Sequence, residues 1–203
     1  MKIHLVDVNP EMVLAWQAAF DDEPAVAIYH GSIFGTGADT LVSPANSFGF
    51  MDGSLDLAIS NRLGWHVQDR LQTRIRKEHG GELPVGCAIV VDTADEKIPF
   101  LISAPTMRVP IYLGPESINA YLATRAAFIA ALSDERIRTV AISGMGTGVG
   151  RIPPAICAQQ MRAAFDQVFR GTPFPDSWES AQRAHQRLYA VRTRDIQFKA
   201  NAT

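Results

Sequence analysis

The sequence predicts an α/β fold in three layers, an α/β/α sandwich in which helices cover both faces of a mixed, largely parallel central sheet. Short apolar runs alternate with amphipathic helical segments along almost the whole chain, and glycine-rich loops follow two of these runs. The alternation ends at residues 171–176, which contain two prolines. We therefore expect one domain over residues 1–170. Residues 171–203 are predicted to be a C-terminal extension with one appended helix packed on the domain and a frayed tail.

The chain begins with a predicted strand and helix. Residues 3–8 form an apolar run, and Asn9 and Pro10 then suit the N-cap and the first turn of a helix. The helix is marked by an apolar stripe at helical spacing: Met12, Val13, Trp16 and Phe20.

The other elements follow from the same patterns. Further strands are expected at residues 26–29, 40–43, 87–93, 98–103 and 139–143. Further helices are expected at residues 54–62, 65–78, 117–132 and 177–188, with one more starting at Pro153 and Pro154. The polar turn at residues 94–97 predicts that the two strands flanking it pair with each other.

Composition excludes several classes of function. With 203 residues, 19 basic and 21 acidic side chains and a net charge of -2, the chain has no broad electrostatic reason to bind nucleic acid. No apolar segment is long enough for a signal peptide or a membrane span, so we expect a cytoplasmic protein with no membrane partner. The five histidines and two cysteines lack metal-ligand spacing, and we expect no metal and no cofactor.

Two glycine-punctuated loops, residues 43–56 and 143–151, each connect an apolar strand to a helix. Such a connection presents backbone N–H groups and the positive end of a helix dipole, which attract an anion. In the second loop Gly148 is followed by Val149 rather than by the lysine of a P-loop, the motif that binds nucleoside triphosphates. We expect a phosphate-binding cleft, and a plain tight turn is the alternative for the second loop.

Polar side chains in the first loop have two interpretations each. Asn46 either hydrogen-bonds a sugar hydroxyl of a ligand or bonds the backbone of its own turn. Asp52 and Asp56 flank a helix start, where acids are favoured, and the position alone predicts that at least one of them is a cap. Arg108 and Arg151 lie next to the loops and are candidates to pair with a phosphate or with an acid.

Four motifs in order resemble the macrodomain, the ADP-ribose-binding module. They are Gly31-Ser32-Ile33, Ser43-Pro44-Ala45-Asn46, the segment 53–59 and Gly146-Thr147-Gly148-Val149-Gly150. The resemblance covers most of residues 1–170, and the segment 105–110 is similar to the bacterial or phage-associated type.

This resemblance implies a site for ADP-ribose. Asn46 would approach the distal ribose, and Asp56 stands where MacroD-type hydrolases have an aspartate that orients or activates the attacking water. These two residues are the predicted catalytic pair. The predicted ligand-binding residues are Gly31, Ser32, Ile33, Ala45, Asp52, Gly53, Ser54, Leu55, Gly146, Thr147, Gly148, Val149, Gly150 and Arg151, with the last loop gripping the diphosphate through backbone N–H groups.

The chain also departs from the family pattern. Ser32 stands where many macrodomains have an aspartate that holds adenine, and Asp7 is either a substitute or a helix-entry residue beside Asn9. Gly150 stands where MacroD-type enzymes have an aromatic residue. Phe48 or Phe50 is a candidate to fill that space, and the alternative for either is a place in the core. A second hydrolase branch, which acts on glutamate-linked and DNA-linked ADP-ribose, uses a lysine and an aspartate that this chain lacks.

Three functions follow from the resemblance. The first is an ADP-ribosyl hydrolase that acts on a modified protein, a small ester or a nucleobase. The second is a non-catalytic reader of ADP-ribose or a related nucleotide, and the third is a phage-related assembly protein. The expected partner is ADP-ribose or an ADP-ribosylated macromolecule, and a nucleic acid is expected only as such a substrate.

Overall fold

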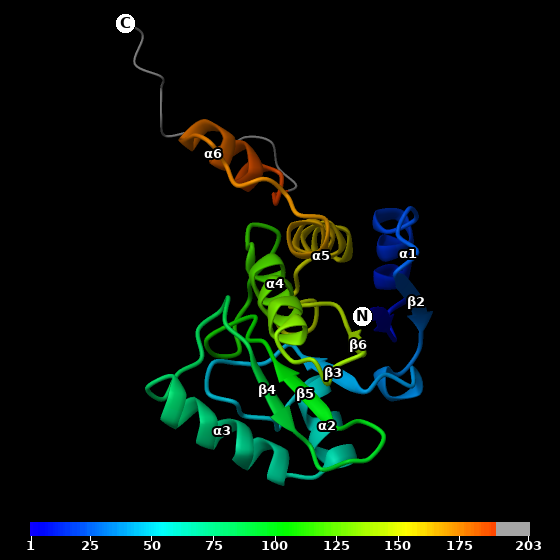
Figure 1. Cartoon of the computed structure of the whole chain (residues 1–203), viewed down its shortest axis with the longest axis vertical. Coiled ribbons are helices and arrows are strands. Elements are labelled where there is room, and N and C mark those ends of the chain that lie inside the picture. Colours follow the sequence, from blue (N-terminus) through cyan, green and yellow to red (C-terminus); the bar gives the residue numbers. More distant parts are fainter. Residues whose placement is uncertain (190–203) are drawn as a thin grey trace, which may run out of the picture.

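One six-stranded sheet forms the centre of the computed structural model, which describes residues 1–189 (Figure 1). The strand order is β2 (Val26–His30), β1 (Lys2–Asp7), β6 (Thr139–Ile142), β3 (Thr40–Ser43), β5 (Phe100–Ser103) and β4 (Ile89–Asp92). All neighbours are parallel except β4 and β5, which pair antiparallel across the turn at residues 94–97. The mixed, largely parallel sheet and this pairing are confirmed.

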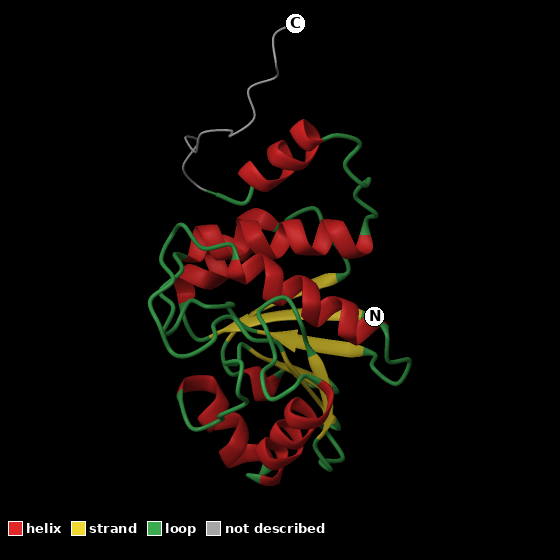
Figure 2. Ribbon diagram, turned by 90° about the vertical axis from the view of Figure 1, so that its left-hand side faces the viewer, coloured by secondary structure: helices red, strands yellow, loops and turns green. Residues whose placement is uncertain are grey.

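Helices cover both faces of the sheet, which gives the predicted three layers (Figure 2). One layer contains α1 (Pro10–Ala19), α4 (Asn119–Leu132) and α5 (Pro154–Phe169). The other contains α2 (Ser54–Leu63), α3 (His66–Glu78) and the short 3-10 helix η1 (Ile33–Gly35). Neighbouring strand residues serve opposite layers: Val42 packs in the first and Leu41 in the second. Strands buried on both faces require continuous apolar runs, and the sequence has them.

The predicted C-terminal helix forms as α6 (Trp178–Gln186), which lies beyond α5 (Figure 1). None of its residues is buried, because its sequence has no stripe of large apolar side chains. The link to the domain comes from the segment after the helix: Leu188 is buried, and the Gln160 side chain donates a 3.0 Å hydrogen bond to its carbonyl. The expected frayed tail lies outside the described residues. Within residues 1–189, no helix has the length and apolar character needed to span a membrane.

Candidate ligand-binding cleft

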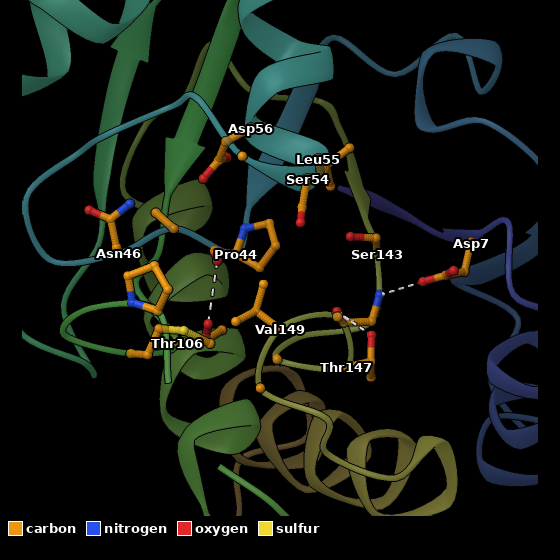
Figure 3. Close-up of a pocket in the computed structure, with 18 of the residues that line it drawn as sticks. Asp7, Pro44, Asn46, Ser54, Leu55, Asp56, Thr106, Ser143, Thr147 and Val149 are labelled. Atoms are coloured by element: carbon orange, nitrogen blue, oxygen red, sulfur yellow. Dashed lines mark hydrogen bonds between the residues drawn. The ribbon is translucent and has the colours of Figure 1, made fainter. Parts of the chain in front are cut away.

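A cleft of about 330 Å³ opens at the carboxyl ends of the parallel strands (Figure 3). This volume is in the range of small-molecule sites, and the edge of the sheet is where open α/β folds bind ligands. The lining comes from the end of β1 and from the segments that follow it and four other strands. It consists of residues 6–8 at and after the end of β1, 31 and 33 after β2, 44–46, 50 and 52–56 after β3, 106–107 and 110 after β5, and 143–144 and 146–150 after β6.

The predicted site residues are brought together in this cleft, with two exceptions. All of them line it except Ser32 and Arg151. The Ser32 hydroxyl accepts a 3.4 Å hydrogen bond from the Phe34 N–H and caps η1. The Arg151 N–H donates a 3.1 Å hydrogen bond to the Gly148 carbonyl and closes the second glycine loop. Both residues therefore support the loops from outside the cleft.

Asp7 lines the cleft at the end opposite Asn46 (Figure 3). One carboxylate oxygen accepts a 2.9 Å hydrogen bond from the Asn9 N–H, so the helix-entry role is confirmed. The other accepts a 3.0 Å hydrogen bond from the Gly144 N–H. Asp7 therefore also fastens the second glycine loop to the end of β1. The sequence does not indicate this contact, because Asp7 and Gly144 are far apart along the chain.

The segment after β5 also lines the cleft, although none of its residues is among the predicted ligand-binding residues. Thr106 is buried, and its hydroxyl donates a 3.3 Å hydrogen bond to the Pro44 carbonyl of the first loop. The Asn119 side chain at the start of α4 donates a 2.7 Å hydrogen bond to the Thr106 carbonyl. Since β5 lies beside β3 in the sheet, its exit necessarily reaches the same edge. No glycine-rich loop marks this segment in the sequence.

Asn46 bonds the backbone of its own loop, which was one of its two predicted interpretations. Its side-chain N–H donates to the Phe50 carbonyl at 2.7 Å, and its oxygen accepts from the N–H groups of Phe48 and Phe50 at 3.1 and 3.3 Å. The loop is also pressed against α3, since a Cβ built on Gly49 lies 2.9 Å from Ile75 Cδ1. Gly49 has φ +68°, which favours glycine. Asn46 thus shapes the cleft wall.

Asp56 is a buried carboxylate in the first turn of α2, with 8% of its surface exposed. Its pKa is raised from 3.8 to about 6, mainly by burial, and the negative charge of Asp52 contributes in the same direction. A hydrogen bond from the Ser43 hydroxyl at the end of β3 opposes this rise. The prediction that Asp52 or Asp56 is a cap is wrong: the N-cap is Gly53 and has no side-chain partner. Asp56 lies beyond the cap position and bonds Ser43 instead.

No lysine, arginine or histidine lines the cleft within residues 1–189, whereas three aspartates do: Asp7, Asp52 and Asp56. Arg108 pairs with the acid Glu82 at 2.8 Å, and its guanidinium carbon lies 5.0 Å from the centre of the Phe48 ring. An anion bound here would therefore depend on backbone N–H groups of the glycine loop and on helix N-termini. Such uncharged backbone donors can bind an anion even in a cleft that is lined by three aspartates.

Comparisons with known proteins agree with this arrangement. The family model for the Macro domain matches residues 42–161, a range that includes both glycine loops. A protein of Aquifex aeolicus is 38% identical over 136 residues, which cover 67% of this chain and 78% of that protein. A protein of Aeropyrum pernix is 30% identical over 146 residues, which cover 72% of each chain.

Solved structures have the same fold. The Oceanobacillus iheyensis macrodomain with ADP has a TM-score of 0.59 at 18% identity, covering 78% of this chain and 86% of that one. The macrodomain of Mycobacterium tuberculosis DarG has a TM-score of 0.57 at 20% identity, and the match covers 68% of this chain and 88% of that one. The Trypanosoma brucei macrodomain in complex with ADP-ribose has a TM-score of 0.56 at 19% identity, and the match covers 70% of this chain and 57% of that one.

Proposed function

This chain belongs to the macrodomain family, and we propose that its cleft binds ADP-ribose and hydrolyses an ADP-ribosyl linkage. Two proteins of the same fold were solved with ADP and with ADP-ribose. In this chain the loop at residues 146–150 offers backbone N–H groups for the diphosphate. The distal ribose would then lie toward Asn46 and Asp56, at the other side of the cleft.

The observation that carries the hydrolase proposal is Asp56, a buried carboxylate that faces the cleft with a pKa raised to about 6. A general base works best when its pKa is close to the working pH. In the proposed reaction the Asp56 carboxylate accepts a proton from a water molecule, and the water oxygen bonds to the anomeric carbon of the distal ribose. The carrier group leaves from that carbon with the bonding electron pair and takes up a proton. The Ser43 hydroxyl holds the carboxylate in place.

We expect the Asp56→Asn variant to release ADP-ribose from modified carriers at least 100-fold more slowly than the wild type, since general-base catalysis contributes about 10²- to 10⁴-fold. Release is measured by chromatography, and ADP-ribose affinity is measured by calorimetry. The matched control is Asp69→Asn, which neutralises an exposed aspartate in the first turn of α3. Wild-type release rates in Asp56→Asn would refute the role of Asp56.

One observation favours the second candidate, a non-catalytic reader. The three hydrogen bonds of Asn46 to its own loop leave its amide engaged rather than directed at a ribose. A reader would bind ADP-ribose without releasing it from any carrier. The same two measurements on the wild type distinguish these functions: binding with turnover supports the hydrolase, and binding without turnover supports the reader.

A further inference from the structure

Two exposed side chains of the first loop, an aromatic ring and a carboxylate, line the cleft, and the charge of the carboxylate acts on Asp56. Phe50 is 54% exposed, Asp52 is also exposed, and both line the cleft. Among residues 1–189 the Asp52 carboxylate has no hydrogen-bond or ion-pair partner, although its charge acts on Asp56. Of the two aromatic candidates, Phe50 lines the cleft and Phe48 does not, and the hydrolytic step proposed above does not use Phe50.

The loop that carries these two residues is held rigidly. Asn46 clamps both backbone groups of Phe50. Met51, which stands between Phe50 and Asp52 in the sequence, is fully buried. Its N–H donates a 2.7 Å hydrogen bond to the Gln68 side chain, and its carbonyl accepts a 2.8 Å hydrogen bond from the Ser60 hydroxyl. The exposure of Phe50 is therefore built into the structure. A large aromatic side chain held in this way at the rim of a cleft is typical of a contact site.

The chemistry around this rim favours a planar cation. The face of an aromatic ring and a carboxylate both attract positive charge, and no cationic side chain lines the cleft to compete within the described residues. Val149, 50% exposed, and Pro110 complete an apolar rim. Such surroundings suit a delocalised, weakly hydrated cation better than a compact ammonium group. A carrier with its own carboxylate would meet Asp52 and Asp56 and be repelled.

We propose that Phe50 and Asp52 form a subsite for a planar cation attached to the distal ribose. The favoured ligands would carry ADP-ribose on a guanidinium or a pyridinium group. This inference rests on the proposed binding of ADP-ribose, because that binding places the carrier at the rim. A cation above an exposed ring and beside an exposed carboxylate predicts a preference of about threefold to tenfold over a neutral carrier.

Two matched ligand pairs test the subsite by calorimetry. NAD⁺ and NADH differ in the charge of the nicotinamide ring and are titrated into Asp56→Asn, because the wild type is proposed to cut an ADP-ribosyl linkage. One peptide that carries ADP-ribose on arginine or on asparagine is titrated into Asp56→Asn, in which the linkage is expected to stay intact. We expect the cationic member to bind more tightly in at least one pair. A preference in the first pair alone indicates a pyridinium, and a preference in the second alone indicates a guanidinium.

Variants then show whether the preference comes from this subsite. Asp52→Asn and Phe50→Leu should each reduce the ratio of cationic to neutral affinity toward one, whatever happens to the absolute affinities. Glu82→Gln, which changes an acid outside the cleft, should keep the ratio. If ADP-ribose binds and neither pair shows a preference, or if both variants keep it, the subsite is refuted. If free ADP-ribose does not bind, the proposed function fails and the subsite fails with it.

Discussion

The raised pKa of Asp56 makes the stability of the folded protein depend on pH. Burial, with a contribution from the Asp52 charge, raises this pKa from 3.8 to about 6, so the folded protein holds a proton at pH 5 that the unfolded chain has lost. The folded state binds more protons than the unfolded state in this range, so the Asp56 contribution to stability is greatest below pH 4. This contribution falls as the pH rises through about 6. At pH 7.5 it leaves the free energy of unfolding lower than below pH 4 by an amount on the order of 3 kcal/mol.

The Asp56→Asn variant cannot lose this proton, and we expect it to be more stable than the wild type at pH 7.5, by about 1 to 3 kcal/mol. The difference should shrink toward zero at pH 4. Urea unfolding at several pH values measures it, with Asp69→Asn as the control for losing one exposed negative charge. A difference that stays constant with pH would show that Asp56 does not titrate in this way. A variant that is more stable yet inactive would also exclude unfolding as the cause of lost activity.

At the scale of elements, the second glycine loop has no room for a side chain at Gly150 but has room for one at Gly148. The Gly150 carbonyl accepts hydrogen bonds from the N–H groups of Leu113 and Gly114 at 2.8 and 3.1 Å. A Cβ on Gly150 would lie 2.5 Å from the Gly146 carbonyl oxygen, whereas a Cβ on Gly148 meets nothing within 4 Å. This close packing leaves no room for an aromatic side chain at residue 150.

We therefore expect Gly150→Ala to lower the free energy of unfolding by about 1 to 3 kcal/mol, the usual cost of overpacking. Gly148→Ala, in the same loop, should change it by about 0.5 kcal/mol or less. Chemical denaturation of both variants gives the comparison. Equal effects of the two substitutions would mean that the loop moves to accept a side chain at residue 150.

The elements themselves were largely predictable, because their patterns are local. The strand at residues 40–43 is confirmed with the same bounds, and the predicted strand at 87–93 shortens to Ile89–Asp92. The apolar pattern continues through Cys87, but the Cys87 N–H bonds the Pro84 carbonyl in a turn. The contacts that complete the cleft join distant segments, as Asp7 does with Gly144. Periodicity and motifs contain no information on such pairs.

Across the whole molecule, Gln160 joins three parts of the chain. This buried side chain accepts a 3.1 Å hydrogen bond from the Tyr121 N–H in α4. It donates to the carbonyls of Ser117 at 2.7 Å and Leu188 at 3.0 Å. It therefore connects α5, the start of α4 and the C-terminal extension. The sequence could not indicate this role, since a glutamine in a helix is normally a surface residue.

The absence of cationic side chains from the cleft lining within residues 1–189 has a kinetic consequence. The net charge of -2 and three lining aspartates repel an approaching dianion at long range, while the backbone N–H groups act only at contact. Added salt should therefore speed the association of ADP-ribose, opposite to lysine- and arginine-lined sites, and leave dissociation nearly unchanged. Stopped-flow measurements with a fluorescent ADP-ribose analogue from 20 to 500 mM salt would show this, and an association rate that falls with salt would point to electrostatic attraction instead. On this basis the protein would capture its ligand most rapidly where ionic strength is high.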